Sequence, residues 1–239
     1  MFADDLLLGM QAALPKAELR FDFLQGFGTD SAVITDLGNL SGVLFSPNDI
    51  SFIRESGTWY CMLADLFLNR VFRVTFGNGI SSPPTDVDTL LSAPAVSGPR
   101  GIKTVRDVHG NAYCAIANFN TNVVSVYAFG NSVLNTPVLT DTFTVAGASG
   151  LTDVDLIRDC DHWYALCSNN GCPLIQLVDL GVTLDTLTPS VTSFSIGSSF
   201  SLSTCIVNEG DMFYAFTSNC NGNVYLTRLG EHLSSPSFA

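Results

Sequence analysis

The sequence predicts an all-β fold built from a repeated unit of about 50 residues, and two observations support this. First, one pattern recurs four times, a polar turn followed by an aromatic and apolar run. Its tyrosines are 53, 51 and 50 residues apart: Tyr60, Tyr113, Tyr164 and Tyr214. A fixed period of this length is typical of repeat architectures. Second, 46% of the 239 residues are hydrophobic and only 13% are charged. Ser, Thr, Asn and Gly must therefore cover much of the surface, as in β-rich proteins with many turns.

The chain begins outside this repeat. Residues 1–17 have apolar side chains at helical spacing, ending near Pro15, which predicts a short amphipathic helix. A partly ordered leader is the alternative. Residues 18–38 match the second half of a unit, so the repeat starts in its middle. Full units are then expected over residues 39–92, 93–145 and 146–196, and a last unit without its fourth strand over residues 197–239.

Each full unit is expected to contain four strands. The first strand is exemplified by residues 49–54, and the second by residues 59–63, an unbroken apolar run that indicates a strand covered on both faces. The third alternates, as in residues 70–76, and the fourth is short and polar, as in residues 138–143. Four-stranded units of this length are typical of β-propeller blades. The ring has four blades if the N-terminal strand completes the last unit, and a partial fifth blade otherwise.

The charge of the chain argues against a nucleic-acid partner. The formal net charge is −12, with only ten Lys and Arg, and no basic run is present that could neutralise a phosphate backbone. The first ten residues carry acids where a secretory signal needs a basic end. No apolar stretch approaches the length of a membrane span. We therefore expect neither a signal peptide nor membrane insertion.

Two segments suggest a relationship to known repeats. Residues 129–137 read Phe-Gly-Asn-Ser-Val-Leu-Asn-Thr-Pro, and residues 76–83 are a variant of the same motif. With the Asn-rich hairpins, this resembles propeller repeats of Bacteroidetes surface and gliding-motility proteins, and the resemblance covers about residues 19–230. Related modules occur in virion proteins of phages that infect such bacteria. The resemblance implies a propeller fold and a place on a virion or an extracellular surface.

Few residues suggest chemistry. His109 and His162 fall in the turn between the first and second strands, where an exposed turn residue is the simpler interpretation. The densest acidic cluster is the set of weak calcium candidates Asp153, Asp155, Asp159 and Asp161. It lacks the spacing of a calcium loop. The recurrent Arg54, Arg106 and Arg158 favour structural pairing over anion binding. No catalytic residue, metal site or cofactor is predicted.

The Asn-rich hairpins between the second and third strands are the predicted loop-face binding positions. They contain Asn118, Asn120, Asn122, Asn169, Asn170, Asn219, Asn221 and Asn223. We therefore expect a non-catalytic structural or binding module that contacts protein subunits or a surface glycan, with oligomerisation or strand exchange possible. The alternatives are a glycan-cleaving propeller enzyme with inward carboxylates such as Asp153 and Asp155, or a fragment of a longer adhesin propeller.

Overall fold

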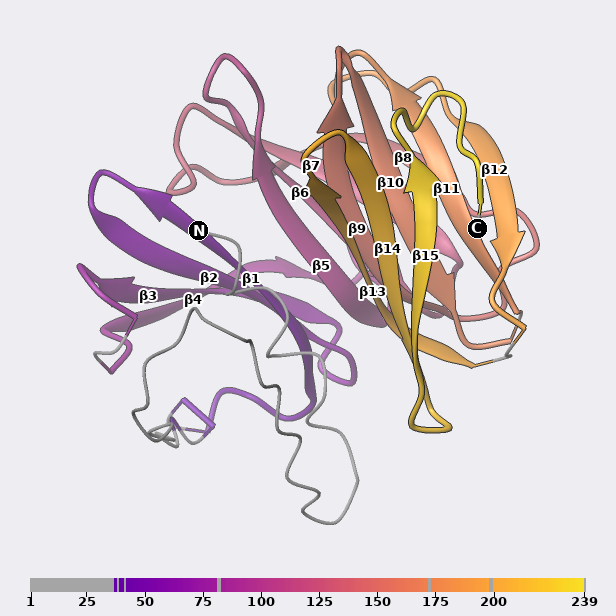
Figure 1. Cartoon of the computed structure of the whole chain (residues 1–239). Helices are drawn as coiled ribbons and strands as arrows, with labels where there is room; N and C mark the ends of the chain where they lie inside the picture. The colour runs from indigo at the N-terminus through magenta and orange to yellow at the C-terminus, as the bar shows by residue number, and fades with distance from the viewer. Residues whose placement is uncertain are drawn as a thin grey trace, which may run out of the picture.

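The computed structural model describes residues 37, 39–40, 42–80, 83–171, 173–197 and 200–238. The helix expected over residues 1–17 lies outside the described residues, as does nearly all of the partial unit expected over residues 18–38. The described part contains 15 strands in four antiparallel sheets (Figure 1). It contains no helix, and so none long and apolar enough to cross a membrane.

The four sheets follow one another along the chain as the blades of a propeller, which confirms the predicted fold. Blade 1 comprises β1 (Pro47–Glu55), β2 (Thr58–Asp65), β3 (Arg70–Gly77) and β4 (Asp86–Ser92). Blade 2 comprises β5 (Pro99–Arg106), β6 (Ala112–Asn118), β7 (Val123–Gly130) and β8 (Val138–Thr144). Blade 3 comprises β9 (Leu151–Asp159), β10 (His162–Asn169), β11 (Leu174–Gly181) and β12 (Ser190–Ser195). Blade 4 has three strands, β13 (Ser201–Glu209), β14 (Met212–Asn219) and β15 (Val224–Gly230).

In blades 2 and 3 the second strand is covered on both faces, as its apolar run predicts. All seven residues of β6 are buried. Tyr113, Ala115 and Ala117 point into the core that blade 2 shares with blade 3, whereas Cys114 and Ile116 point into the core shared with blade 1. Because side chains alternate between the faces of a strand, one apolar run supplies two cores. The cores between the blades are therefore continuous layers of apolar side chains.

The first strand of each blade is the innermost one. The pairs β1–β5, β5–β9 and β9–β13 lie against each other across the blade boundaries, and Figure 1 shows these strands running through the middle of the molecule. No comparable contact joins β13 to β1 among the described residues. The described blades therefore form an arc, with blade 1 and blade 4 at its ends.

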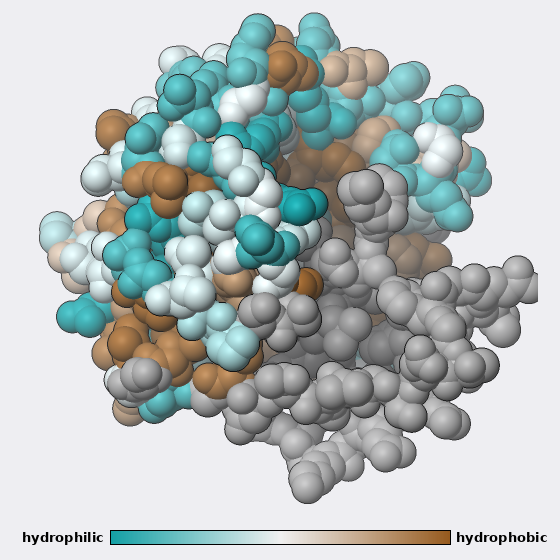
Figure 2. All heavy atoms as spheres, turned by 90° about the vertical axis from the view of Figure 1, so that its left-hand side faces the viewer, coloured by the Kyte–Doolittle hydropathy of each residue, from teal (hydrophilic) through white to brown (hydrophobic). Residues whose placement is uncertain are grey.

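Blade 1 is partly covered by its own flanking residues. Leu40, Leu44 and Leu68 pack beside Leu63 and Phe72 on the side of the sheet away from blade 2. Figure 2 views the molecule from the side of this blade and shows small hydrophobic groups scattered among hydrophilic residues. Among the exposed apolar side chains of this region are Phe45 and Phe67, whose rings meet edge to face at 6.3 Å between centroids.

Candidate active site

The beginnings of the inner strands bring several charged side chains into one region. Asp49 stands near the start of β1, Lys103 lies on β5, and Asp153 and Asp155 lie on β9. Asp49 and Asp153 are 104 residues apart and occupy the same place in units two repeats apart. The repeat thus places carboxylates of different blades around the same part of the propeller.

Each of these carboxylates bonds to the inner strand of the following blade. Asp49 accepts the backbone N–H of Ile102 on β5 at 2.7 Å. Asp153 accepts the hydroxyl of Ser203 at 2.7 Å and the backbone N–H of Thr204 at 2.8 Å, both on β13. Inner strands of neighbouring blades are not joined by a backbone ladder, so these carboxylates supply the missing acceptors. The same bonds fix the orientation of the carboxylates.

A glycine and a lysine of β5 shape the region between Asp49 and β9. A Cβ atom on Gly101 would lie 2.5 Å from the Asp153 Cα atom and 2.6 Å from its Oδ1. Only glycine therefore permits β5 to approach β9 this closely. Two residues further on, the Lys103 Nζ atom lies 3.1 Å from Asp155 Oδ1. Asp155 also accepts the backbone N–H of Ile206 at 2.7 Å.

Burial alters the proton affinity of two of these carboxyl groups. Burial and the neighbouring charge of Asp153 raise the pKa of Asp49 well above its ordinary value. Burial raises the pKa of Asp153 to about 6, against the opposing effect of the hydrogen bonds from Thr204 and Ser203. The negative charge of Asp153 therefore favours the protonated form of Asp49. Such an arrangement can supply a general acid beside a charged carboxylate.

The predicted Asn-rich hairpins divide into buried and accessible positions. Asn118, Asn169 and Asn219 end their strands and are buried. The Asn118 side chain accepts the N–H of Ser97 at 2.9 Å and donates to Val123 O at 3.1 Å. These three residues share the place of Asp65 in blade 1, a position that closes the turn. The exposed members of the predicted set are Asn120, Asn221 and Asn223, with Asn122 and Asn170 partly exposed.

The four weak calcium candidates do not converge on one point. Asp153 and Asp155 lie near the start of β9, whereas Asp159 ends this strand and Asp161 lies in the following turn. Asp159 lies six positions after Asp153 along the strand, which corresponds to about 20 Å. The candidate active site and the far end of β9 are therefore two separate places.

His109, His162 and Arg106 lie in or next to the turns between the first and second strands of their blades, and His162 is the first residue of β10. His109 is exposed in the β5–β6 turn, and the Nδ1 atom of His162 lies 2.9 Å from Asp179 Oδ1. The hydrogen bond and charge of Asp179 raise the pKa of His162. Arg106 donates to Gly110 O at 2.7 Å and pairs with Glu55 of the preceding blade.

Sequence reasoning passed over Asp49, Lys103 and His232. Asp49 had a detectable signal, because it matches Asp153 two repeats later. His232 had none, since its neighbours come from another blade. A cavity of about 540 Å³ lies elsewhere, on blade 4, and is lined by Val207, Asn208, Glu209, Tyr214, Phe216 and Leu226. This cavity contains none of the inner-strand aspartates.

No family model and no curated protein matches this sequence, whereas many solved structures share the fold. An exo-β-1,3-galactanase from Phanerochaete chrysosporium superposes with a TM-score of 0.60 at 14% identity, over 80% of this chain and 49% of the enzyme. An exo-β-1,3-galactanase from Clostridium thermocellum gives 0.62 at 14% identity, over 84% and 50%. An α-L-arabinofuranosidase from Clostridium thermocellum, named as a GH43 protein, gives 0.55 at 12% identity, over 82% and 72%. The chain thus spans about half the length of the two galactanases.

These comparisons correct the functional prediction. The sequence favoured a non-catalytic structural or binding module, but the three solved structures compared above are glycan-cleaving enzymes. The prediction rested on the absence of a local catalytic motif. That absence is weak evidence in a propeller, because acids on different blades can lie close together without forming a local motif. At this identity the comparisons establish the fold alone, and the findings agree better with the alternative of a glycan-cleaving propeller.

Proposed function

We propose that this chain hydrolyses glycosidic bonds with carboxyl groups carried by its inner strands. The observation that supports this most directly is the pair Asp49 and Asp153, which lie on different blades, with the charge of Asp153 raising the pKa of Asp49. Glycoside hydrolysis uses two carboxyl groups, one that donates a proton and one that is ionised. Galactanases and an arabinofuranosidase have the same fold, so β-1,3-galactans and arabinofuranosides are the first substrates to test.

The arrangement suggests different roles for the two aspartates. Asp49 is partly exposed and its pKa is raised well above the ordinary value, so it can hold a proton at neutral pH and give it to the leaving oxygen. Asp153 is ionised above a pH of about 6 and supplies the negative charge beside the developing cation. Lys103, ion-paired with Asp155, limits the repulsion among the three carboxylates.

The test measures sugar release by the purified chain from β-1,3-galactan, arabinan and the corresponding aryl glycosides. We expect release from at least one of these substrates and a loss of at least about 100-fold in kcat for Asp49→Asn, because general acid catalysis contributes on this order. Asp211→Asn is the matched control, since Asp211 is exposed in the β13–β14 turn. Circular dichroism confirms that each variant is folded.

Two outcomes would contradict the proposal. One is the absence of release from every substrate by a folded, monodisperse chain. The other is an Asp49→Asn variant that retains the activity of the unmodified chain, which would show that Asp49 does not take part in the reaction.

A further inference from the structure

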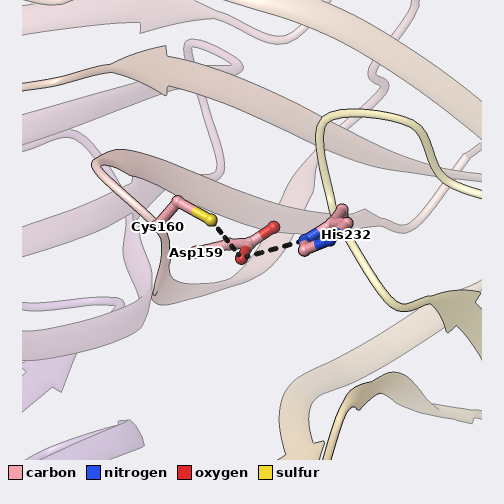
Figure 3. Close-up of side chains that lie close together, drawn as sticks. All are labelled: Asp159, Cys160 and His232. Carbon is pink, nitrogen blue, oxygen red and sulfur yellow. Dashed lines mark hydrogen bonds and ion pairs between the residues drawn. The ribbon is translucent and has the colours of Figure 1, made fainter.

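A second group of reactive side chains lies at the opposite end of β9 from Asp153. Asp159 ends the strand, Cys160 follows in the β9–β10 turn, and His232 comes from the loop after β15 (Figure 3). The group therefore joins blade 3 to the C-terminal loop of blade 4. In Figure 3 the thiol and the imidazole approach the Asp159 carboxylate from two sides.

The distances within this group are close to those of a metal site. Asp159 Oδ1 lies 3.5 Å from Cys160 Sγ and 3.8 Å from His232 Nδ1, and all three ligand atoms fall within 4.8 Å of one another. A tetrahedral zinc ion with ligands at roughly 2.0–2.3 Å separates its ligand atoms by about 3.3–3.6 Å. Cys160 and His232 are exposed, so small side-chain rotations would close the difference.

Glu55 occupies the position in blade 1 that is equivalent to Asp159, and its contacts can be compared with those of Asp159. Glu55 accepts hydrogen bonds from Val133 N–H, the Ser132 hydroxyl and the guanidinium of Arg106. These three bonds lower the pKa of Glu55, although burial alone would raise it. Glu55 is thus a carboxylate stabilised by a permanent positive charge.

At the corresponding junction of blades 3 and 4 the backbone hydrogen bond is present, but the position equivalent to Arg106 carries no arginine. Asp159 accepts the N–H of Leu233 at 2.7 Å, as Glu55 accepts that of Val133. However, Asn208 stands 102 residues after Arg106, at the equivalent position, and His232 replaces Ser132. Among the described residues, His232 is the only group in ion-pair contact with Asp159. Asp159 is 9% exposed, so its charge is poorly screened by solvent.

We propose that Asp159, Cys160 and His232 bind a zinc ion that takes the place of the guanidinium found at the equivalent junction. Thiolate, imidazole and carboxylate are all zinc ligands, and three protein ligands leave a fourth position for water. Calcium fits poorly, because it needs six or more oxygen ligands and does not favour a thiolate. The hydrogen bond from Leu233 holds the other Asp159 oxygen and orients the carboxylate. The ion would fasten the loop after β15 to blade 3.

The first experiment uses Co²⁺ as a spectroscopic probe on the full chain, kept reduced and freed of metal by a chelator. Binding at this site should produce a thiolate-to-cobalt charge-transfer band, which zinc displaces. Cys160→Ser should abolish the band, and His232→Ala should weaken cobalt binding at least about tenfold. Cys220→Ser is the matched control, because Cys220 is also a free, exposed cysteine, and it should leave the band unchanged.

A second experiment measures thermal unfolding with and without zinc. At about 100 times the dissociation constant, zinc should raise Tm by roughly 5–10 °C, and this rise should disappear in Cys160→Ser. Asn208→Arg restores the equivalent of Arg106 and should raise Tm in the absence of zinc while reducing the zinc-dependent rise. The proposal is overturned if the cobalt band is absent, if it persists in Cys160→Ser, or if zinc changes Tm equally in the unmodified chain and in Cys160→Ser.

Discussion

Replacing Asp153 by Asn should remove a pH dependence that this carboxyl group imposes on folding. Burial raises its folded-state pKa to about 6 from an ordinary value of 3.8. The folded state therefore binds a proton more tightly than the unfolded chain, and stability is lost as pH rises between these two values. Asn carries no charge but keeps an oxygen that can accept from Ser203 and Thr204. The stability of the Asp153→Asn variant should therefore not fall in this way as pH rises.

The size of the effect follows from the shift. The full difference between about 6 and 3.8 corresponds to about 3 kcal/mol, because a tenfold change in proton affinity is worth about 1.4 kcal/mol. Between pH 5 and pH 7 the folded carboxyl releases most of its proton while the unfolded one is already ionised. Integrating over this interval gives a loss of about 1.3 kcal/mol, or roughly 3–5 °C in Tm for a chain of this length.

Urea denaturation at pH 5, 6, 7 and 8 measures this directly. Relative to the unmodified chain, Asp153→Asn should gain about 1.3 kcal/mol in unfolding free energy between pH 5 and pH 7. Asp211→Asn, in an exposed turn, controls for the general effect of removing one negative charge. The reasoning is refuted if the difference between the unmodified chain and Asp153→Asn is constant from pH 5 to pH 8 or changes in the opposite direction.

Three further substitutions test the packing and the polar contacts. Leu166→Ala should lower the free energy of unfolding by about 2–5 kcal/mol, because Leu166 is fully buried. Leu134→Ala, at an exposed position, should change it by less than about 0.5 kcal/mol. Equal urea midpoints for these two variants would contradict the prediction. Glu55→Gln should cost about 1–3 kcal/mol at pH 7 through the weakened contact with Arg106. This cost should diminish as pH falls through the lowered pKa of Glu55, and a cost that stays constant from pH 7 down to the acid unfolding of the chain would argue against the ion pair. Asp65→Ala should cost on the order of 3 kcal/mol in the same assay, since its carboxylate accepts three backbone N–H groups; a loss below about 1 kcal/mol would show that water replaces these bonds.

Much of this fold could be predicted from the sequence because a propeller repeats the same local pattern in every blade. The unbroken apolar run around Tyr113 fixed β6 as a strand covered on both faces, and the spacing of its copies defined the blades. The missing fourth strand of the last unit was also correctly predicted for the described residues. The blade boundaries follow from the repeat period alone, so they could be predicted without any knowledge of three-dimensional contacts.

The site was harder to predict because its members meet only across blade boundaries. Asp49 and Asp153 are far apart in sequence, and nothing local distinguishes them from surface acids until the inner strands are placed side by side. Composition was misleading for the hairpins, where Asn118 is used to close a turn rather than displayed on a surface. The Asp159 group depends on a loop from the next blade, which no spacing within one unit reveals.

The order of the described blades predicts which of them unfolds first. Blades 2 and 3 have a neighbouring sheet on each side, whereas blades 1 and 4 have one such neighbour each among the described residues. In a structure stabilised mainly by nearest-neighbour contacts, the end units open at a lower free energy than the central ones. Amide protons of β6 and β10 should therefore exchange with solvent most slowly, and those of β14 and β15 much faster. Local opening of blade 4 would therefore displace β13 and break the hydrogen bonds that hold two of the three aspartates, Asp153 and Asp155.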